Sequence, residues 1–337
     1  MKPQFLPSLV NPPFGDAALY VEFRFEGRAL LFDVGDIRAL PNRKLLRISH
    51  VFVSHAHMDH FAGLDRLVRV CLGREKRLRL FGPPGFIDRV EHKLHGYTWN
   101  LVHNYPGDFV LVVTEVDDAG RAQRAEFHSR RAFRREGGQH LPLCGRVLHR
   151  ESAFSVRYAV LDHQIPSLAF VLEEGRHINI WKNRLTALGL PVGPWLNTLK
   201  QRVREKAPPQ TPIRTDDGQS FTLGWLKDAI VQIVPGQKLA YITDATGHEP
   251  NARRMREIAR NADILYIETT FLDRDRPLAR AKHHLTARQA GEIARQAGVR
   301  RMVPMHFSPR YEGMADQLRA EAGAAFAGGS PKSGHDS

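Results

Sequence analysis

The chain has 337 residues, 42% of them hydrophobic, which is enough to bury the core of one large α/β domain with insertions. No apolar run is long enough to span a bilayer, and residues 1–10 lack the pattern of a secretory signal. Two cysteines are too few for a disulfide framework. We therefore expect neither a membrane protein nor a disulfide-rich secreted protein, and the composition fits a reduced cytoplasm. The 49 lysines and arginines exceed the 36 aspartates and glutamates, and the net charge of +13 favours a polyanionic partner such as nucleic acid, unless the excess only keeps the protein soluble.

Strand-like patterns dominate the first half of the chain. Helical spacing is confined to residues 63–72 and 86–94. Alternating or continuous apolar runs predict strands at residues 18–23, 29–32, 48–53, 78–81, 109–116, 154–160 and 168–173. Residues 120–150 are polar and arginine-rich with weak periodicity, and they form either hairpins or a loose loop, in a basic insertion at about 117–150.

The second half alternates between strands and helices after an inserted piece. Residues 181–209 are predicted to form two short helices, broken at Gly193-Pro194, within an arm at about 175–212. Strands follow at 239–243, 264–268 and 301–304, and helices at 251–260, 286–297 and 314–327. We therefore expect one layered α/β domain over 1–327 and a small, polar, disordered tail at 328–337.

A cluster of potential metal ligands directly follows the predicted strand at 48–53. His55, His57, Asp59 and His60 form the pattern His-x-His-x-Asp-His. Residues two apart point the same way on an extended segment, so the first two can bind one ion, and the turn into the next helix brings the other two to a second position close by. Imidazole and carboxylate are ligands that suit zinc. A polar loop that holds three histidines by chance is the weaker alternative, because four ligands fall within six positions at a strand end.

Three more candidate ligands stand at the ends of other predicted strands, namely His163, Asp244 and His306. Each taken alone is more simply a turn residue with satisfied hydrogen bonds. Their shared position at the carboxyl ends of strands, where ligand groups gather in layered α/β folds, favours the metal interpretation.

Together these motifs resemble those of a known family. The segment from His55 to His60 matches the signature of the metallo-β-lactamase superfamily, and further segments resemble its ribonuclease Z branch, whose members cut the 3′ trailer from precursor tRNA. These segments are residues 80–86, Asp162-His163 with Pro166, and residues 241–246, 267–271, 284–287 and 306–311. The chain departs from that branch at its start, which lacks the Gly-rich strand end, and at Leu285, where serine is common. The resemblance implies a four-layer αβ/βα metallo-β-lactamase sandwich with an inserted arm.

The resemblance also implies the contents of the site. It implies two zinc ions, with manganese or iron as alternatives, and a shared hydroxide that attacks phosphorus. One ion would be held by His55, His57 and His163, the other by Asp59, His60 and His306, with Asp244 as the bridge.

Other residues would act on the proton and the phosphate. Asp59 would hold or accept the proton of the water, and His284 would donate a proton to the leaving oxygen or bind the phosphate, with its tautomer fixed by Glu268. Arg310 and Ser308 would contact the substrate. Glu268 as a plain strand-end acid and Arg310 as a surface cation are the alternatives.

The leading function is therefore endonucleolytic cleavage of the 3′ trailer of precursor tRNA. The arm supports RNA binding through several cations and the run Gly189–Pro194, which resembles the arm that grips tRNA in the family. Trp181 and Trp195 either stack on bases or pin the arm to a core. Hydrolysis of a small phosphodiester or another ester is the alternative, and a binding module that no longer cuts fits the complete ligand set less well. Relatives are commonly dimers, so the resemblance allows a homodimer.

Overall fold

The computed structural model describes residues 4–143, 145–175 and 177–328. Cys144 and residues 329–337, for which disorder is predicted, lie outside this range. The chain divides into a main unit, residues up to 173 and from 237 onward, and a small unit, residues 174–236. Within the described ranges, no helix is both long and apolar enough to cross a membrane.

The first sheet of the main unit has eight strands that follow chain order from edge to edge. They are β1 (Phe5–Leu9), β2 (Leu19–Phe23), β3 (Ala29–Phe32), β4 (Ile48–Phe52), β5 (Lys76–Gly82), β6 (Phe109–Val116), β7 (Arg121–His128) and β8 (Arg135–Pro142). Strands β3 to β6 pair in parallel, and the pairs at both edges are antiparallel. The apolar runs of β3 and β6 suit strands that are covered on both faces.

The second sheet has six strands. In spatial order they are β18 (Arg301–Met305), β17 (Ile264–Glu268), β16 (Lys238–Ile242), β11 (Pro166–Glu174), β10 (Phe154–Asp162) and β9 (Val147–Arg150). Strands β16, β17 and β18 run parallel to one another, and β11 runs antiparallel to β16.

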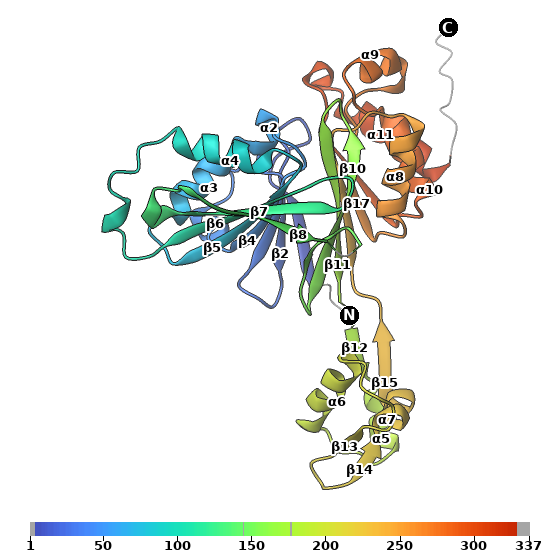
Figure 1. Cartoon of the computed structure of the whole chain (residues 1–337). Helices are drawn as coiled ribbons and strands as arrows, with labels where there is room; N and C mark the ends of the chain where they lie inside the picture. The colour runs from blue at the N-terminus through green and yellow to red at the C-terminus, as the bar shows by residue number, and fades with distance from the viewer. Residues whose placement is uncertain (1–3, 144, 176, 329–337) are drawn as a thin grey trace. The chain divides into compact units, whose positions relative to one another are not determined.

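Helices cover the outer face of each sheet, as Figure 1 shows. Those of the first sheet are α1 (Asn42–Leu45), α2 (Met58–Phe61), α3 (Leu64–Cys71) and α4 (Phe86–His95), and they share a buried core with its outer side chains. Those of the second sheet are α8 (Glu249–Ala259) and α10 (Ala287–Gln296), which share one buried core. The helices α9 (Arg276–Ala281) and α11 (Ala315–Ala327) contribute to a smaller hydrophobic cluster.

Aromatic side chains fill the space between the two sheets. The ring of Phe52 stacks on Phe32 and Phe81 of its own sheet, with centroids 5.1 and 4.9 Å apart. Across the gap, Phe170 and Tyr241 of the second sheet lie 5.7 and 5.8 Å from Phe32. Burying each such ring stabilises the fold by roughly 1.5–3 kcal/mol. The order helix, sheet, sheet, helix confirms the predicted four-layer metallo-β-lactamase sandwich.

The basic stretch at 120–150 is built from strands, so hairpins rather than a loose loop are the correct alternative. β7 and β8 extend the first sheet beyond β6, and β9 forms the edge of the second. Ala122, Ala125 and Phe127 of β7 are buried between polar neighbours. The spacing is three residues from Ala122 to Ala125 and two from Ala125 to Phe127, and the pairing with β8 shifts register between Arg124 and Ala125. This irregular spacing explains the weak signal in the sequence.

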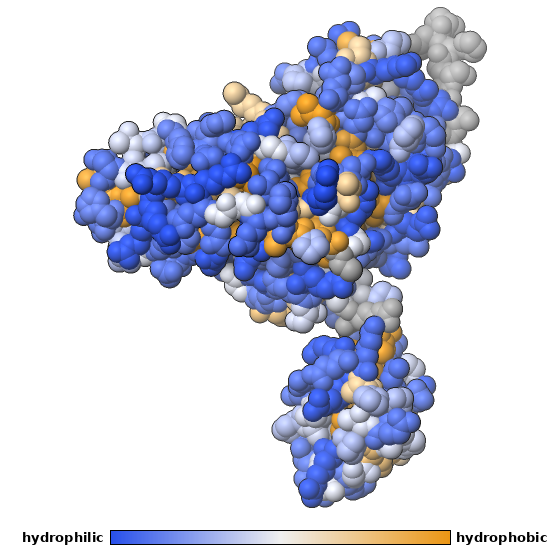
Figure 2. All heavy atoms as spheres, in the orientation of Figure 1, coloured by the Kyte–Doolittle hydropathy of each residue, from blue (hydrophilic) through white to orange (hydrophobic). Residues whose placement is uncertain are grey.

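The small unit contains the segment predicted as an arm and continues to Gly236. Its elements are β12 (His177–Ile180), α5 (Lys182–Ala187), α6 (Trp195–Arg204), β13 (Pro212–Arg214), β14 (Ser220–Thr222), α7 (Leu223–Ile230) and β15 (Val231–Val234). Trp195 is buried in its core, whereas Trp181 is 39% exposed and carries the guanidinium of Arg184 3.8 Å from its ring. On the face drawn in Figure 2, hydrophilic side chains cover most of the surface of each unit.

Candidate metal centre

The histidine segment changes from extended to helical backbone within six residues. His55 and His57 lie in the loop after β4, and α2 begins at Met58, so Asp59 and His60 lie on a helical turn. The change of direction places the two pairs at neighbouring positions, as the spacing predicts.

The second sheet supplies the remaining candidates at the ends of its strands. Asp244, Glu268 and His306 lie at the carboxyl ends of the parallel strands β16, β17 and β18. His163 lies in the turn between β10 and β11. Because parallel strands end at the same edge of a sheet, these side chains gather there.

Two of these residues have unusual backbone conformations. The φ angles of Asp244 and His306 are 41° and 57°, in the left-handed region that residues other than glycine rarely adopt. Such strain persists where the surrounding structure holds a side chain in one position, which is typical of functional sites.

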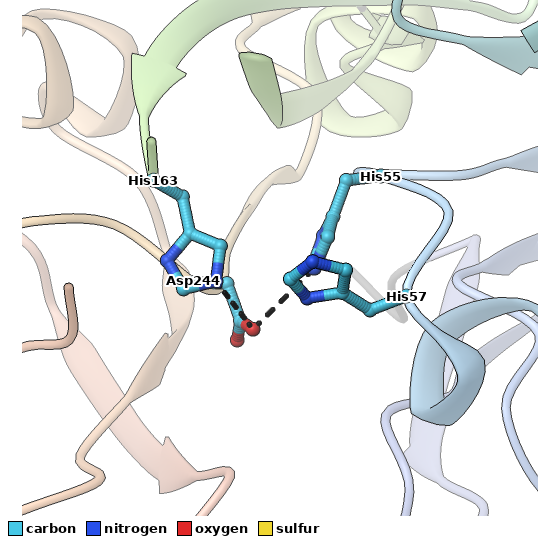
Figure 3. A group of neighbouring side chains, drawn as sticks. All are labelled: His55, His57, His163 and Asp244. Carbon is cyan, nitrogen blue, oxygen red and sulfur yellow. Dashed lines mark ion pairs between the residues drawn. The ribbon is translucent and has the colours of Figure 1, made fainter. Parts of the chain in front are cut away.

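The first group of ligand atoms comes from His55, His57, His163 and Asp244, and these atoms lie within 4.8 Å of one another. Figure 3 shows the three rings and the carboxylate turned toward a common space. The Nε2 atoms of His55 and His163 lie 3.5 and 3.6 Å from Asp244 Oδ2.

The second group comes from Asp59, His60 and His306, again within 4.8 Å. Asp59 Oδ2 lies 3.4 Å from His60 Nε2 and 3.2 Å from His306 Nε2. Asp244 also reaches this group, since its carboxylate oxygens lie 3.4 Å from His60 Nε2 and 3.3 Å from His306 Nδ1. All seven predicted ligands therefore lie together, and Asp244 stands between the two groups.

The donor set fits bound metal. Among the described residues, His55 Nε2, His60 Nε2 and His306 Nδ1 are buried without a hydrogen-bond partner, and each lies beside an Asp244 oxygen. A buried ring nitrogen without a partner costs roughly 1–3 kcal/mol, which coordination would offset. Imidazole nitrogens and carboxylate oxygens are the ligands that zinc takes in proteins.

The charges of the site also suit a cation. Burial, followed by the nearby charge of His60, lowers the pKa of His55 to about 2, so its ring is neutral and can act as a ligand. Burial would raise the pKa of Asp244, but His306 and His60 outweigh it and hold the carboxyl well below its usual range. Burial alone would lower the pKa of His60, but the charges of Asp244 and Asp33 outweigh burial and raise that pKa above its ordinary value. A metal cation would replace the proton that these carboxylates otherwise favour on His60.

Asp33 holds the predicted ligand His60 in place through a hydrogen bond, and Asp33 was not among the predicted site residues. Its buried carboxylate accepts hydrogen bonds from His60 Nδ1 at 2.9 Å, from the Ser54 hydroxyl at 2.9 Å and from the Tyr241 hydroxyl at 2.8 Å. Such a partner fixes the tautomer of a ligating histidine. The signal in the sequence was the same as for Asp244, since Asp33 is an acid directly after the apolar run of β3.

His163 is oriented by the backbone. Its Nδ1–H donates to the carbonyl of His283 at 2.8 Å, which leaves Nε2 free to face Asp244. No pattern in the sequence indicates this role for His283.

His284 and Glu268 form a hydrogen-bonded pair at the edge of the ligand groups. Glu268 Oε2 accepts from His284 Nδ1 at 2.8 Å, and the same buried carboxylate accepts from the Ala245 amide and the Thr270 hydroxyl at 2.6 Å each. Burial lowers the pKa of His284, but the charge of Glu268 outweighs it and raises that pKa to about 9. The ring lies 5.0 Å from that of His163 and 5.7 Å from that of His306.

The two predicted substrate contacts lie on the turn after β18. Ser308 Oγ accepts a hydrogen bond from the Arg310 amide at 3.4 Å, so it caps that turn. The guanidinium of Arg310 is exposed and forms no salt bridge with any described residue. Neither side chain belongs to the two ligand groups.

Known proteins resemble this chain in sequence and in fold. A family model described as the beta-lactamase superfamily domain matches residues 27–134 and 197–307. The chain is 32% identical to ribonuclease Z of Deinococcus radiodurans, over 90% of each chain, and 32% identical to ribonuclease Z of Thermobifida fusca, over 90% of this chain and 83% of that one. The short form of human tRNase Z has the same fold, with a TM-score of 0.52, 20% identity, and coverage of 91% of this chain and 93% of that chain. The chain therefore belongs to the ribonuclease Z family of the metallo-β-lactamase superfamily.

Proposed function

We propose that this protein is a zinc-dependent phosphodiesterase that removes the 3′ trailer of precursor tRNA by endonucleolytic cleavage. The observation that carries the proposal is the pair of ligand groups joined through Asp244, with the His284–Glu268 pair beside them. His55, His57 and His163 would hold one zinc ion, Asp59, His60 and His306 the other, with Asp244 between them. Zinc held there supplies Lewis acidity toward water and toward phosphoryl oxygens.

Asp59 serves the attacking water. Burial would raise its pKa, but the hydrogen bond from His306 and the nearby charge of His60 outweigh it and hold the carboxyl below its usual range. The carboxylate is therefore an acceptor at neutral pH, able to orient the water and take up its proton as the oxygen attacks phosphorus.

His284 serves the leaving oxygen. With its pKa near 9, the ring carries protons on both nitrogens at neutral pH, and Glu268 holds the proton at Nδ1. The proton at Nε2 passes to the 3′ oxygen of the tRNA as the bond from phosphorus to that oxygen breaks. The products are a 3′-hydroxyl on the tRNA and a 5′-phosphate on the trailer.

The small unit is proposed as the arm that holds the RNA. It contains nine lysines and arginines against five acidic residues. Exposed cations gather on α5 and α6 and in the turn after it, namely Lys182, Arg184, Arg202, Arg204 and Lys206. Positive charge on an exposed surface suits structured RNA, which is held mainly through its backbone.

The decisive experiment incubates zinc-loaded protein with a 3′-extended tRNA transcript and maps the cut. We expect one cut at the 3′ end of the mature tRNA, abolished by His163→Ala and retained by His140→Ala, which removes an exposed histidine elsewhere. Hydrolysis of a chromogenic diester without any cut in the transcript would instead identify a small-molecule phosphodiesterase. The homodimer, the cytoplasmic location and the substrate contacts of Ser308 and Arg310 stay predictions.

A further inference from the structure

A third group of potential ligands lies between the two sheets. His50, His149 and Glu151 each offer one ligand atom, and these atoms lie within 4.8 Å of one another. His50 belongs to β4 of the first sheet, His149 belongs to β9 of the second, and Glu151 follows β9. None of the three is among the seven ligands of the candidate metal centre.

Hydrogen bonds determine which nitrogen of His50 carries its proton. The Ser49 hydroxyl donates its single hydrogen to the carbonyl of Ala29 at 3.2 Å, and its oxygen lies 2.9 Å from His50 Nδ1. With the Ser49 hydrogen directed to Ala29, the oxygen accepts from Nδ1–H, and the lone pair of the His50 ring lies on Nε2. Burial, followed by the nearby charge of His149 and Arg79, lowers the pKa of His50 to about 2, so the ring stays neutral.

The lone pair on His50 Nε2 has no partner among the described residues. The side chain is 1% exposed, and its ring stacks with Phe52 and Phe81. The centroid of the His149 ring, which belongs to β9 of the second sheet, lies 4.2 Å from the centroid of the His50 ring. An acceptor buried in this way costs roughly 1–3 kcal/mol unless a donor or a metal reaches it.

We propose that His50, His149 and Glu151 bind a structural zinc ion that joins β4 to β9. Two neutral imidazoles and one carboxylate form a donor set that zinc accepts, and water can complete it from the side where Glu151 is partly exposed. Such an ion would tie the two sheets together at a position separate from the candidate metal centre.

Cations near the group narrow the choice of metal. Arg28 donates to both oxygens of Glu151, at 2.9 and 2.7 Å, and Arg79 and Lys76 add positive charge near His50. Magnesium and calcium bind through several oxygen ligands and would find only one carboxylate, already neutralised. Zinc bonds strongly to imidazole nitrogen, and the group offers two imidazoles.

The test compares zinc bound per chain at equilibrium with micromolar free zinc. The variants are His149→Gln and Glu151→Gln, with His140→Gln as the control that removes an exposed histidine outside the group. We expect both variants to bind one zinc fewer than the wild type and the control. Equal zinc content in all four proteins would overturn the proposal.

Two features keep this test decisive. Glu151→Gln preserves the size and shape of the side chain, so it remains informative where His149→Gln folds poorly. Anomalous scattering at the zinc edge gives a second readout on wild-type crystals: a peak among the three side chains supports the proposal, and peaks confined to the candidate metal centre contradict it. Neither readout uses RNA cleavage, so failure of the proposed function would not mimic failure of this site.

Discussion

His284 is proposed to protonate the leaving oxygen and not to bind metal. Its ring is held by Glu268 and lies next to the ligand histidines without being among the seven ligands. His284→Ala should therefore lower the rate of transcript cleavage by about 10²–10⁴-fold while bound zinc stays constant. Single-turnover cleavage and zinc content measured on the same sample check this, and loss of zinc would make His284 a ligand instead.

The pKa of His284 predicts how the rate of cleavage depends on pH. Glu268 raises the pKa of His284 to about 9, and the proposed acid is active only while protonated. Activity should therefore be lost as pH rises through that pKa. Glu268→Gln removes the charge that raises it, so the falling limb of the rate profile should move to lower pH. An unchanged limb would contradict the role of Glu268.

Asp33 would act on the proposed zinc through the predicted ligand His60, whose Nδ1 donates to it. Asp33→Asn keeps the size of the side chain but weakens the hydrogen bond to His60 Nδ1. We expect zinc affinity to fall by about 10–100-fold, measured by competition with a chelator. Asp316→Asn, at an exposed carboxylate of α11, should leave the affinity unchanged.

At the scale of elements, close packing positions the short helix α2. A Cβ added at Gly63 would lie 2.2 Å from the Gly35 carbonyl oxygen, whereas one added at Gly27 would meet nothing within 4 Å. Gly63→Ala should lower the free energy of unfolding by about 1–3 kcal/mol because backbone must move. Urea unfolding checks this, and an equal effect of Gly27→Ala would show that loss of glycine, not crowding, is responsible.

Strand β4 carries a buried neutral histidine, and this gives the fold a dependence on pH. Burial lowers the pKa of His50 in the folded chain to about 2, far below the ordinary value of 6.5, and treatment with a chelator keeps the ring free of metal. The unfolded chain takes up a proton below pH 6.5 and the folded chain does not, so stability is full above that pH and falls below it. Relative to His50→Phe, the wild type should lose about 1.4 kcal/mol between pH 8 and pH 5.5, measured by urea unfolding. A constant difference would contradict the neutral state.

At the scale of the whole molecule, the excess of positive charge should appear as salt dependence. The kcat/KM for cleavage of the transcript should fall steeply as the salt concentration rises, whereas the kcat/KM for hydrolysis of a small diester should change little. Arg204→Glu on α6 should reduce the slope of log(kcat/KM) against log salt by about 1. Arg43→Glu on α1, an equal reversal at another exposed helix end, is the matched control, and equal effects of the two would remove the small unit from RNA binding.

The sequence by itself determined the features that rest on local spacing. The pattern from His55 to His60, and the polar residues His163, Asp244 and His306 at strand ends, were readable because a strand followed by a turn fixes where neighbouring side chains point. The apolar runs predicted a layered α/β domain, and the family resemblance implied its four layers.

Only the tertiary structure decided contacts between distant segments. Asp33 and Tyr241 are 208 residues apart, and they meet because the two sheets pack face to face. His50 and His149 come together for the same reason, from strands of different sheets. The hydrophobic period of a strand specifies which face is buried but not which strand of another sheet will cover it. The seven proposed ligands could therefore be predicted from the sequence, whereas the hydrogen bonds behind them and the third ligand group could not.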